Sequence, residues 1–253
     1  RTIKNYFNLE NYQKSATPRI EFRKDDILLL LDSSWYVKFW DEIERVKKQG
    51  GKVYSIVYDL IPVTHPQFCD DYLAHVFKNY FNKSKDFVDK YICISQTVAN
   101  DLRVFLQTNI KNKSSLPEIS YFHLGSDFRI RTVTDDSVDV DIKNIYRKPL
   151  PIYLIVSTVE PRKNHQYLLD VFDSLWASNV NVGLCIVGRI GWKIDASIDI
   201  ILGHPQLGKR LFMFNEASDS DVSYCYQHSK GLLFPSFVEG FGLPIIEIGR
   251  ASC

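Results

Sequence analysis

Residues 231–247 read GLLFPSFVEGFGLPIIE, an apolar run followed by a loop with two glycines and the beginning of a helix. The run from Gly231 to Phe234 is typical of a strand, and Pro244 suits a first helical turn. Gly240 and Gly242 would let a ligand approach the backbone, and the helix N-terminus can face a phosphate. Because ligands of open parallel sheets bind beyond the carboxyl ends of strands, this loop is expected to carry chemistry.

The same alternation of strands and helices runs through most of the chain, which is the pattern of parallel sheets covered by helices. The expected strands are residues 27–31, 53–58, 91–94, 119–124, 152–156, 183–187, 211–214 and 231–234. Apolar periodicity predicts a first helix from residue 37 up to the Gly50-Gly51 stop. Further helices are expected around residues 68–80, 98–105, 164–178, 194–202, 219–228 and 244–252. Residues 27–31 are expected to be buried, and Ser95 is expected to cap a helix.

A break in this alternation divides the chain into two α/β halves. Between Gly125 and Pro149 the pattern is lost, and residues 134–141 contain four aspartates with little apolar content. Such a segment is typical of a connector between domains. We therefore expect a first domain at residues 1–125, a connector at 126–150 and a second domain at 151–253.

The two ends of the chain indicate a segment of something longer. The sequence starts at Arg1, its single methionine is Met213, and the last expected helix has no cap before Cys253. Both domains are therefore expected to be partial, with the chain truncated at both ends.

The composition excludes several classes of protein. The 253 residues include 31 Lys+Arg and 30 Asp+Glu, so nucleic-acid binding lacks its usual basic excess. No apolar run reaches the ~18 to 20 residues that cross a bilayer, and the N-terminus lacks a signal-peptide pattern. We expect a cytoplasmic protein, either free or at the cytoplasmic face of the membrane. The five cysteines are expected to be reduced, packed thiols: Cys69, Cys93, Cys185, Cys225 and Cys253.

A second loop suited to ligand binding follows the expected strand at residues 152–156. It reads STVEPRKN at residues 157–164 and leads into a helix. Arg162 and Lys163 beside a helix N-terminus could hold a diphosphate, since the free N–H groups and the dipole there already favour an anion. The alternative is an exposed basic turn with Asn164 as the helix N-cap, and position and charge alone favour neither.

Two carboxylates, Glu239 and Glu247, bracket the glycine loop at a spacing of eight residues. A carboxylate in this position can accept hydrogen bonds from the two vicinal hydroxyls of a ribose. The alternative is that Glu247 merely complements the helix dipole. Since that alternative leaves Glu239 and the glycines unexplained, a ligand site is favoured.

Together these motifs resemble the retaining GT-B-fold glycosyltransferases of family four, the group 1 glycosyltransferases. The resemblance is carried by Glu-Pro-Arg-Lys-Asn at residues 160–164 and by the Glu239 and Glu247 pair in a Phe-Pro-Ser-x-x-Glu-Gly-Phe-Gly-Leu-Pro run. Further signposts are Tyr-Asp-Leu-Ile-Pro at 58–62, Ile94-Ser95, and His-Leu-Gly-Ser-Asp at 123–127. The likeness spans nearly all of the chain. It implies two Rossmann-like, doubly wound domains that face each other across a cleft, the first on the acceptor side and the second binding a nucleotide sugar.

The resemblance also implies roles for individual residues. Glu247 would bind the donor ribose, Lys163 and Arg162 the diphosphate, and Glu239 would lie near the donor sugar. The remaining donor-binding residues would be Gly240, Phe241, Gly242 and Leu243, together with Ser157 and Gly188, which follow strands. The acceptor side would include Tyr58, Asp59 and His65. Many family members have Arg where this chain has Ser157, and His where it has Tyr58.

The implied reaction is transfer of a sugar from a nucleotide donor to a glycan or lipid-linked acceptor, with retention at the anomeric carbon. Cations aimed at the leaving diphosphate would stabilise it without a metal or other cofactor. The Glu-Pro-Arg-Lys-Asn variety of the family is often associated with mannosyl transfer in surface-polysaccharide assembly, so GDP-mannose is the preferred donor. Because of Ser157 and Tyr58, a catalytically inert sugar-nucleotide-binding or scaffolding relative remains the alternative.

Two other signals receive structural interpretations. Asp219-Ser220-Asp221 has the Asp-x-Asp form of metal-dependent transferases, but it stands where a helix should start. Asp139-Val140-Asp141 in the connector carries still less weight.

Aromatic residues in two expected helices could meet a membrane surface, although core packing explains most of them. They are Trp35, Phe39, Trp40, Phe68, Phe77, Tyr80 and Phe81.

Overall fold

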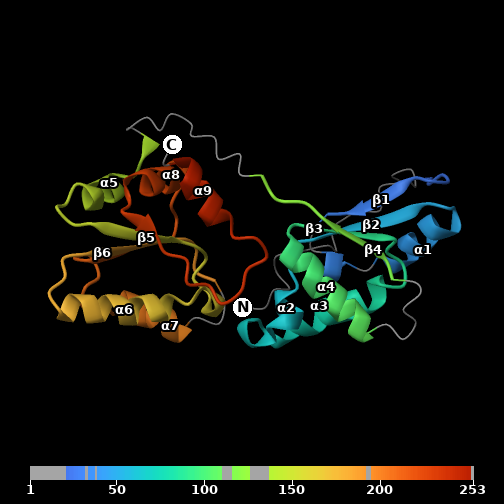
Figure 1. Cartoon of the computed structure of the whole chain (residues 1–253), viewed down its shortest axis with the longest axis horizontal. Helices are drawn as coiled ribbons and strands as arrows, with labels where there is room; N and C mark the ends of the chain where they lie inside the picture. Colours follow the sequence, from blue (N-terminus) through green and yellow to red (C-terminus); the bar gives the residue numbers. More distant parts are fainter. Residues whose placement is uncertain are drawn as a thin grey trace, which may run out of the picture.

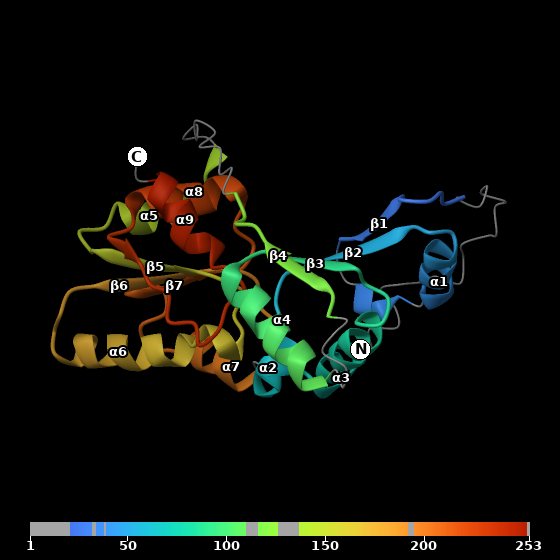
Figure 2. The same cartoon turned by 45° about the vertical axis from the view of Figure 1, so that its right-hand side comes forward.

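The computed structural model describes residues 21–31, 34–37, 39–109, 116–125, 137–191 and 195–251. These residues form two four-stranded parallel sheets, one from each half of the chain (Figures 1 and 2). Each sheet is flanked by helices. The expected α/β class with two parallel sheets is therefore confirmed.

The first sheet follows sequence order, β1-β2-β3-β4. Its strands are β1 (Ile27–Leu30), β2 (Lys52–Val57), β3 (Lys90–Cys93) and β4 (Glu118–Tyr121), all parallel. Its helices are α1 (Trp40–Lys48), the single turn α2 (Ile61–Thr64), α3 (Asp71–Ser84) and α4 (Gln96–Asn109). Ser95 caps α4 as expected, because its Oγ accepts a hydrogen bond from the Val98 N–H at 3.1 Å.

The expectation that residues 27–31 form a buried strand is wrong in one respect. Among the described residues, β1 pairs with β2 alone, and Ile27 and Leu29 are 53% and 44% exposed. Leu28 and Leu30 pack against the core of the first half. Since side chains alternate between the two faces of a strand, an edge strand with one covered face buries only every second residue.

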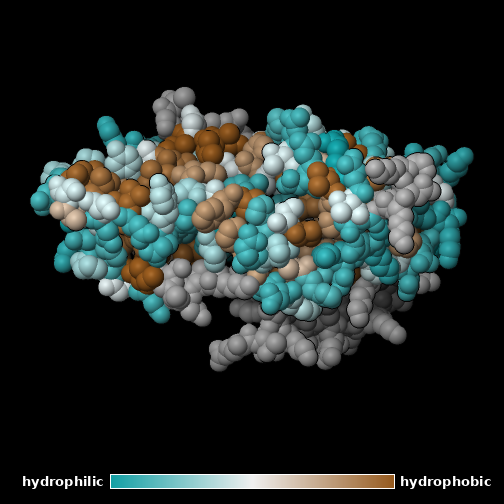
Figure 3. Space-filling view, turned by 60° about the horizontal axis from the view of Figure 1, so that its bottom comes forward, coloured by the Kyte–Doolittle hydropathy of each residue, from teal (hydrophilic) through white to brown (hydrophobic). Residues whose placement is uncertain are grey.

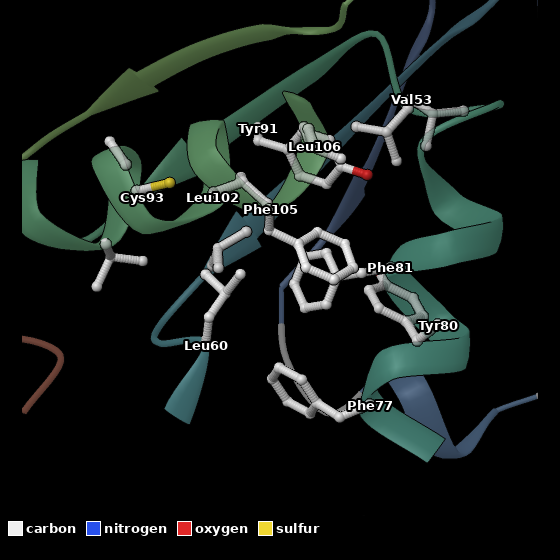
Figure 4. Packing of buried hydrophobic residues seen from close by; sticks show 14 of the residues in the cluster. Val53, Leu60, Phe77, Tyr80, Phe81, Tyr91, Cys93, Leu102, Phe105 and Leu106 are labelled. Atoms are coloured by element: carbon white, nitrogen blue, oxygen red, sulfur yellow. The ribbon is translucent and has the colours of Figure 1, made fainter. Parts of the chain in front are cut away.

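The aromatic residues of the first half are mainly core residues. Helix α3 is capped by Asp70 and begins after a separate turn at Pro66–Phe68, so the helix expected from Phe68 starts later than predicted. Its buried residues include Phe77, Tyr80 and Phe81 (Figure 4). Phe81 packs against Tyr91 of β3 and Phe105 of α4, whereas the rings of Phe77 and Tyr80 lie beside Trp35. Trp35, Phe39 and Trp40 pack against the same cluster. On the face shown in Figure 3, apolar residues lie in separate patches among hydrophilic ones.

The second sheet has the strand order β7-β6-β5-β8. Its strands are β5 (Ile152–Val156), β6 (Gly183–Val187), β7 (Leu211–Phe214) and the short β8 (Gly231–Leu232). Its helices are α5 (Val140–Tyr146), α6 (His165–Ala177), α7 (Asp195–Leu202), α8 (Asp219–His228) and α9 (Leu243–Ala251). In Figures 1 and 2, α6 and α7 cover one face of this sheet, and α5, α8 and α9 cover the other.

Helix α5 lies inside the expected connector and was not predicted. Asp139 caps it by accepting the Asp141 N–H at 2.7 Å, and Ile142 and Ile145 are buried in the core of the second half. The aspartates obscured a short apolar stripe in the sequence. Residues 126–136 of the expected connector, including Ser126 and Asp127 of the family signpost, lie outside the described residues.

Two further expectations concern the cysteines and the membrane. Cys69, Cys93, Cys185 and Cys225 are buried free thiols, as expected, and Cys253 lies outside the described part of the chain. Within that described part, every helix falls short of the length and apolarity needed to cross a membrane.

Candidate functional site

The strand order of the second sheet brings the two expected ligand loops together. From β5 the chain proceeds outward through β6 and β7 and then returns to place β8 on the other side of β5. The crevice at such a switch point, beyond the carboxyl ends of the strands, is the usual ligand site of doubly wound sheets. The loops after β5 and β8 meet there, where the Phe237 N–H donates to the Arg162 carbonyl at 2.9 Å.

A cluster of charged side chains connects these loops. Glu239 Oε2 accepts a hydrogen bond from Arg162 Nη1 at 2.9 Å, and Glu239 Oε1 accepts one from Lys163 Nζ. Arg162 Nε also donates to Glu160 at 3.0 Å. Lys163 is only 8% exposed. The alternative of an exposed basic turn is therefore wrong for this lysine.

Asn164 occupies the N-cap position of α6 but does not cap it with its side chain. Its backbone is left-handed, with φ of 59°, and no side-chain cap hydrogen bond forms. Instead, Nδ2 donates to the Pro235 carbonyl at 3.4 Å. Asn164 thus links the two loops.

The charges in this cluster perturb one another. Burial lowers the pKa of Lys163, and the nearby charge of Arg162 lowers it further. The hydrogen bond to Glu239 acts in the opposite direction but does not outweigh them. Burial by itself would raise the pKa of Glu239, but hydrogen bonds from Lys163 and Ser236 and the cationic neighbours lower it overall. Glu239 is therefore held as a carboxylate between two cations.

The acceptor-side loop of the first half reaches the same cluster. Asp59 accepts the Ile61 N–H on Oδ1 at 2.9 Å, and burial raises its pKa against the opposing field of Arg162. Asp59, Tyr58 and Arg162 line a cavity of about 190 Å³ together with Trp35. Trp35, whose Nε1 is buried with no hydrogen-bond partner among the residues that the structure describes, was not predicted at this site.

His65, the third expected acceptor-side residue, lies apart from this cavity lining. Its ring stacks on Phe68 at 6.2 Å, and Phe68 stacks in turn on Phe237 of the second half at 5.5 Å. His65 thus supports a contact between the halves.

The glycine loop also contacts the first half. The Gly240 carbonyl accepts Ser95 Oγ at 2.7 Å, and a Cβ on Gly240 would lie 2.4 Å from the Tyr58 carbonyl oxygen. Phe241 packs against the first core, near the His123 ring at 6.1 Å. Close approach of the first half therefore explains Gly240, where the sequence suggested approach of a ligand.

Gly242 and Leu243 complete the turn into α9. Gly242 has φ of 90°, a left-handed value that glycine adopts readily. Leu243 is the first residue of α9 and is exposed.

A larger cavity, of about 660 Å³, lies at the carboxyl ends of β5, β6 and β7. Its lining includes Ser157 and Gly188, two of the residues predicted for the donor side, and Arg189, Asn215 and Glu216. Asn215 and Glu216 were missed, although their position directly after a strand was a usable signal. Gly188 is required by the backbone, since a Cβ there would lie 2.0 Å from the Ser157 carbonyl oxygen.

Ser157 has a buried histidine as its neighbour. Its Oγ lies 3.3 Å from Nε2 of His165 at the start of α6. Burial, and secondarily the charge of Lys163, lowers the pKa of His165 to about 4. His165 is therefore neutral near pH 7.

Glu247 lies in α9, beyond its first turn. Tyr226 of α8 donates its hydroxyl hydrogen to Glu247 Oε2 at 2.8 Å. Because the helix dipole acts mainly within the first turn, the interpretation of Glu247 as a dipole complement is not supported.

The Asp-x-Asp signal is a helix start, as interpreted from the sequence. Asp221 forms a capping box with Ser218 and also accepts the Asp139 N–H at 2.8 Å, so that it joins α8 to the start of α5. In the described ranges, no three His, Cys, Asp or Glu side chains gather as a metal site.

Comparison with known proteins links this geometry to a family. Residues 140–253 match the family model described as glycosyl transferases group 1. The chain is 31% identical over 242 residues to the serotype-specific mannosyltransferase WbdA of Escherichia coli, covering 93% of this chain and 29% of WbdA. It is 21% identical over 252 residues to the O-antigen chain mannosyltransferase RfbU of Salmonella typhimurium strain LT2, covering 96% of this chain and 66% of RfbU. The chain thus spans about 29% of the length of WbdA.

Solved structures show the same fold. The pneumococcal O-GlcNAc transferase GtfA in complex with UDP and GlcNAc matches with a TM-score of 0.60 and 17% identity over 91% of this chain and 41% of GtfA. Anabaena Alr3699/HepE in complex with UDP and glucose matches with a TM-score of 0.61 and 14% identity over 87% of this chain and 56% of HepE. The expected fold class is confirmed, and the chain is partial relative to both proteins.

Proposed function

Because the chain belongs to the group 1 glycosyltransferases, whose family model its residues 140–253 match, we propose that it transfers a sugar from a nucleotide donor to an acceptor hydroxyl. The proposed donor is GDP-mannose, and the proposed outcome is retention at the anomeric carbon. The proposed acceptor is a glycan or lipid-linked glycan. The names of WbdA and RfbU, both mannosyltransferases, support the mannosyl donor.

The observation that carries this proposal is the pairing of Arg162 and Lys163 with Glu239 at the switch point. Negative charge grows on the diphosphate as it leaves an oxocarbenium-like sugar. Two cations that are already fixed in place stabilise this charge without reorganisation, and loss of one such donor typically costs ~100 to 1,000-fold in rate. Glu239 pairs with both cations, and we propose that it lies near the donor sugar.

The larger cavity supports a guanine base. Guanine offers N1–H and N2–H₂ donors on one edge and O6 and N7 acceptors on another, and Arg is the usual partner of O6 and N7. A carboxylate at Glu216 suits the two donors, and Arg189 suits the two acceptors. Uracil offers a single N–H donor between two carbonyl oxygens. Because a carboxylate repels those oxygens, Glu216 suits guanine better than uracil.

The smaller cavity supports an acceptor sugar. Its lining includes the aromatic residues Trp35 and Tyr80 and the charged residues Asp59 and Arg162. An apolar, aromatic lining with a few polar groups is typical of small-molecule sites. An acceptor hydroxyl delivered here would face Arg162, and therefore the donor.

Peripheral membrane contact with lipid-linked acceptors remains a proposal, and lack of co-sedimentation with anionic liposomes would remove it.

The test is nucleotide binding by the full chain, measured as a thermal shift and by calorimetry, followed by mannosyl transfer or donor hydrolysis with GDP-mannose. Binding to the native state raises the melting temperature. We expect GDP to stabilise the chain more than UDP does. Glu216→Ala should weaken the binding of GDP but not that of UDP. Glu44→Ala on α1, far along the chain from the cavity, should change the binding of neither nucleotide. No response to either nucleotide would contradict the proposal.

A catalytically inert relative remains the second candidate. Ser157, beside a neutral His165, and Tyr58 stand where many family members have Arg and His. Binding of GDP with neither transfer nor hydrolysis of GDP-mannose would favour this candidate.

A further inference from the structure

Glu247, the carboxylate that the family resemblance assigns to the donor ribose, accepts a hydrogen bond from the buried Tyr226. Tyr226 is 1% exposed and belongs to the core of the second half, and its Oη donates to Glu247 Oε2 at 2.8 Å. Ile248, the next residue after Glu247, packs against the same core cluster. The carboxylate therefore extends from a fixed stretch of α9 toward a fixed hydroxyl on α8.

This hydrogen bond leaves acceptor capacity for a ligand. An ionised carboxylate can accept about four hydrogen bonds, and Tyr226 supplies one of them. Among the described residues, Tyr226 is the hydrogen-bond donor that the structure gives to Glu247. Oε1 and the second lone pair of Oε2 are thus available to two vicinal hydroxyls.

Tyr226 lies one helical turn from a residue that lines the larger cavity. Val222 lines that cavity, and Tyr226 is four residues further along α8, so both side chains lie on the same face of the helix. Burial, together with the charge and hydrogen bond of Glu247, raises the pKa of Tyr226. The raised pKa favours the protonated hydroxyl, which can donate to Glu247.

We infer that Tyr226 is a positioning residue, which fixes the Glu247 carboxylate for recognition of the 2′ and 3′ hydroxyls of the donor ribose. This inference rests on the proposed function. A carboxylate without the tyrosine hydroxyl can rotate, and ordering it again upon binding costs affinity. The cost should appear only when the ligand carries the ribose hydroxyls.

The test compares GDP with 2′,3′-dideoxy-GDP by calorimetry on the full chain, for the wild type and Tyr226→Phe. The wild type should bind GDP much more tightly than the dideoxy nucleotide. In Tyr226→Phe we expect the GDP dissociation constant to rise about tenfold, as for loss of a hydrogen bond to a charged group, and that of dideoxy-GDP to stay unchanged.

Tyr146→Phe is the matched control. The Tyr146 hydroxyl lies 2.8 Å from Ser229 Oγ, and Tyr146 packs against the same core cluster. It should lose similar stability and change neither dissociation constant. Equal weakening of both nucleotides by Tyr226→Phe, or unchanged GDP binding, would overturn the inference while the proposed function stands. A wild type that binds neither nucleotide would remove both.

Discussion

Lys163 and Glu239 are 76 residues apart in the sequence and form an ion pair where the loops after β5 and β8 meet. Each side chain finds its ion-pair partner in the other loop. The strand order, which places β8 next to β5, creates the pair. The proposed transfer reaction depends on this relationship.

Lys163→Ala tests the relationship directly. We expect turnover with GDP-mannose to fall ~100 to 1,000-fold, because one preorganised cation facing the leaving diphosphate is lost. Glu239 keeps Arg162 as its partner, so the fold should persist. Initial rates and circular dichroism measure the two effects. The control is Lys209→Ala, which removes an exposed lysine that donates to the Pro205 carbonyl; near-normal turnover of Lys163→Ala would contradict the assigned role.

Gly240→Ala tests the contact between the halves. The new Cβ would lie 2.4 Å from the Tyr58 carbonyl oxygen, so one backbone must move and the Ser95 hydrogen bond should be strained or lost. Overpacking of this kind typically costs ~1 to 3 kcal/mol. Turnover and melting temperature should both fall. Gly125→Ala is the control, since its added Cβ would have no close contact with the described part of the chain. Equal behaviour of the two variants would show that the halves separate freely.

His165 should make stability depend on pH. Its pKa is about 4 in the folded protein, below the ordinary 6.5, so the unfolded chain binds more protons between these values. The stabilisation is therefore complete above pH 6.5 and is lost as the pH falls toward 4. The upper limit is about 3 kcal/mol, from about 1.4 kcal/mol per pKa unit. Urea unfolding at pH 7, 6 and 5 measures it. His165→Gln should flatten the profile, whereas the exposed His75→Gln should not; a wild-type profile in His165→Gln would refute this assignment.

Asp221→Asn tests the capping box. The carboxylate accepts hydrogen bonds from the N–H and hydroxyl of Ser218 and from the Asp139 N–H. We expect a loss of ~1 to 2 kcal/mol in the free energy of unfolding, as for a lost N-cap, with transfer activity retained. Asp219→Asn, which leaves the capping box intact, should cost less. If Asp221→Asn abolished transfer without loss of stability, a metal-binding role would become the better explanation.

The sequence by itself determined the alternation of elements and the identity of the family. Strands β5, β6 and β7 and helix α8 have the predicted bounds, because continuous apolar runs and a clear helical period leave little ambiguity. The loops with Arg162, Lys163, Glu239 and Glu247 were recognisable because they follow strands. The exposure of β1 was not predictable, since an edge strand and a central strand can have the same apolar run. Helix α5 was missed because its stripe is short and lies among aspartates.

Tertiary structure alone decided which of these residues meet. Lys163 is buried and paired, Gly240 accommodates the Tyr58 backbone, and Tyr226 holds Glu247. Each of these contacts joins segments that the chain brings together only through strand order or domain contact. Local pattern reports which face of an element is apolar, whereas the partner on that face depends on the packing of the whole sheet. The sequence therefore identified the charged and glycine loops, and the packing decided what each one touches.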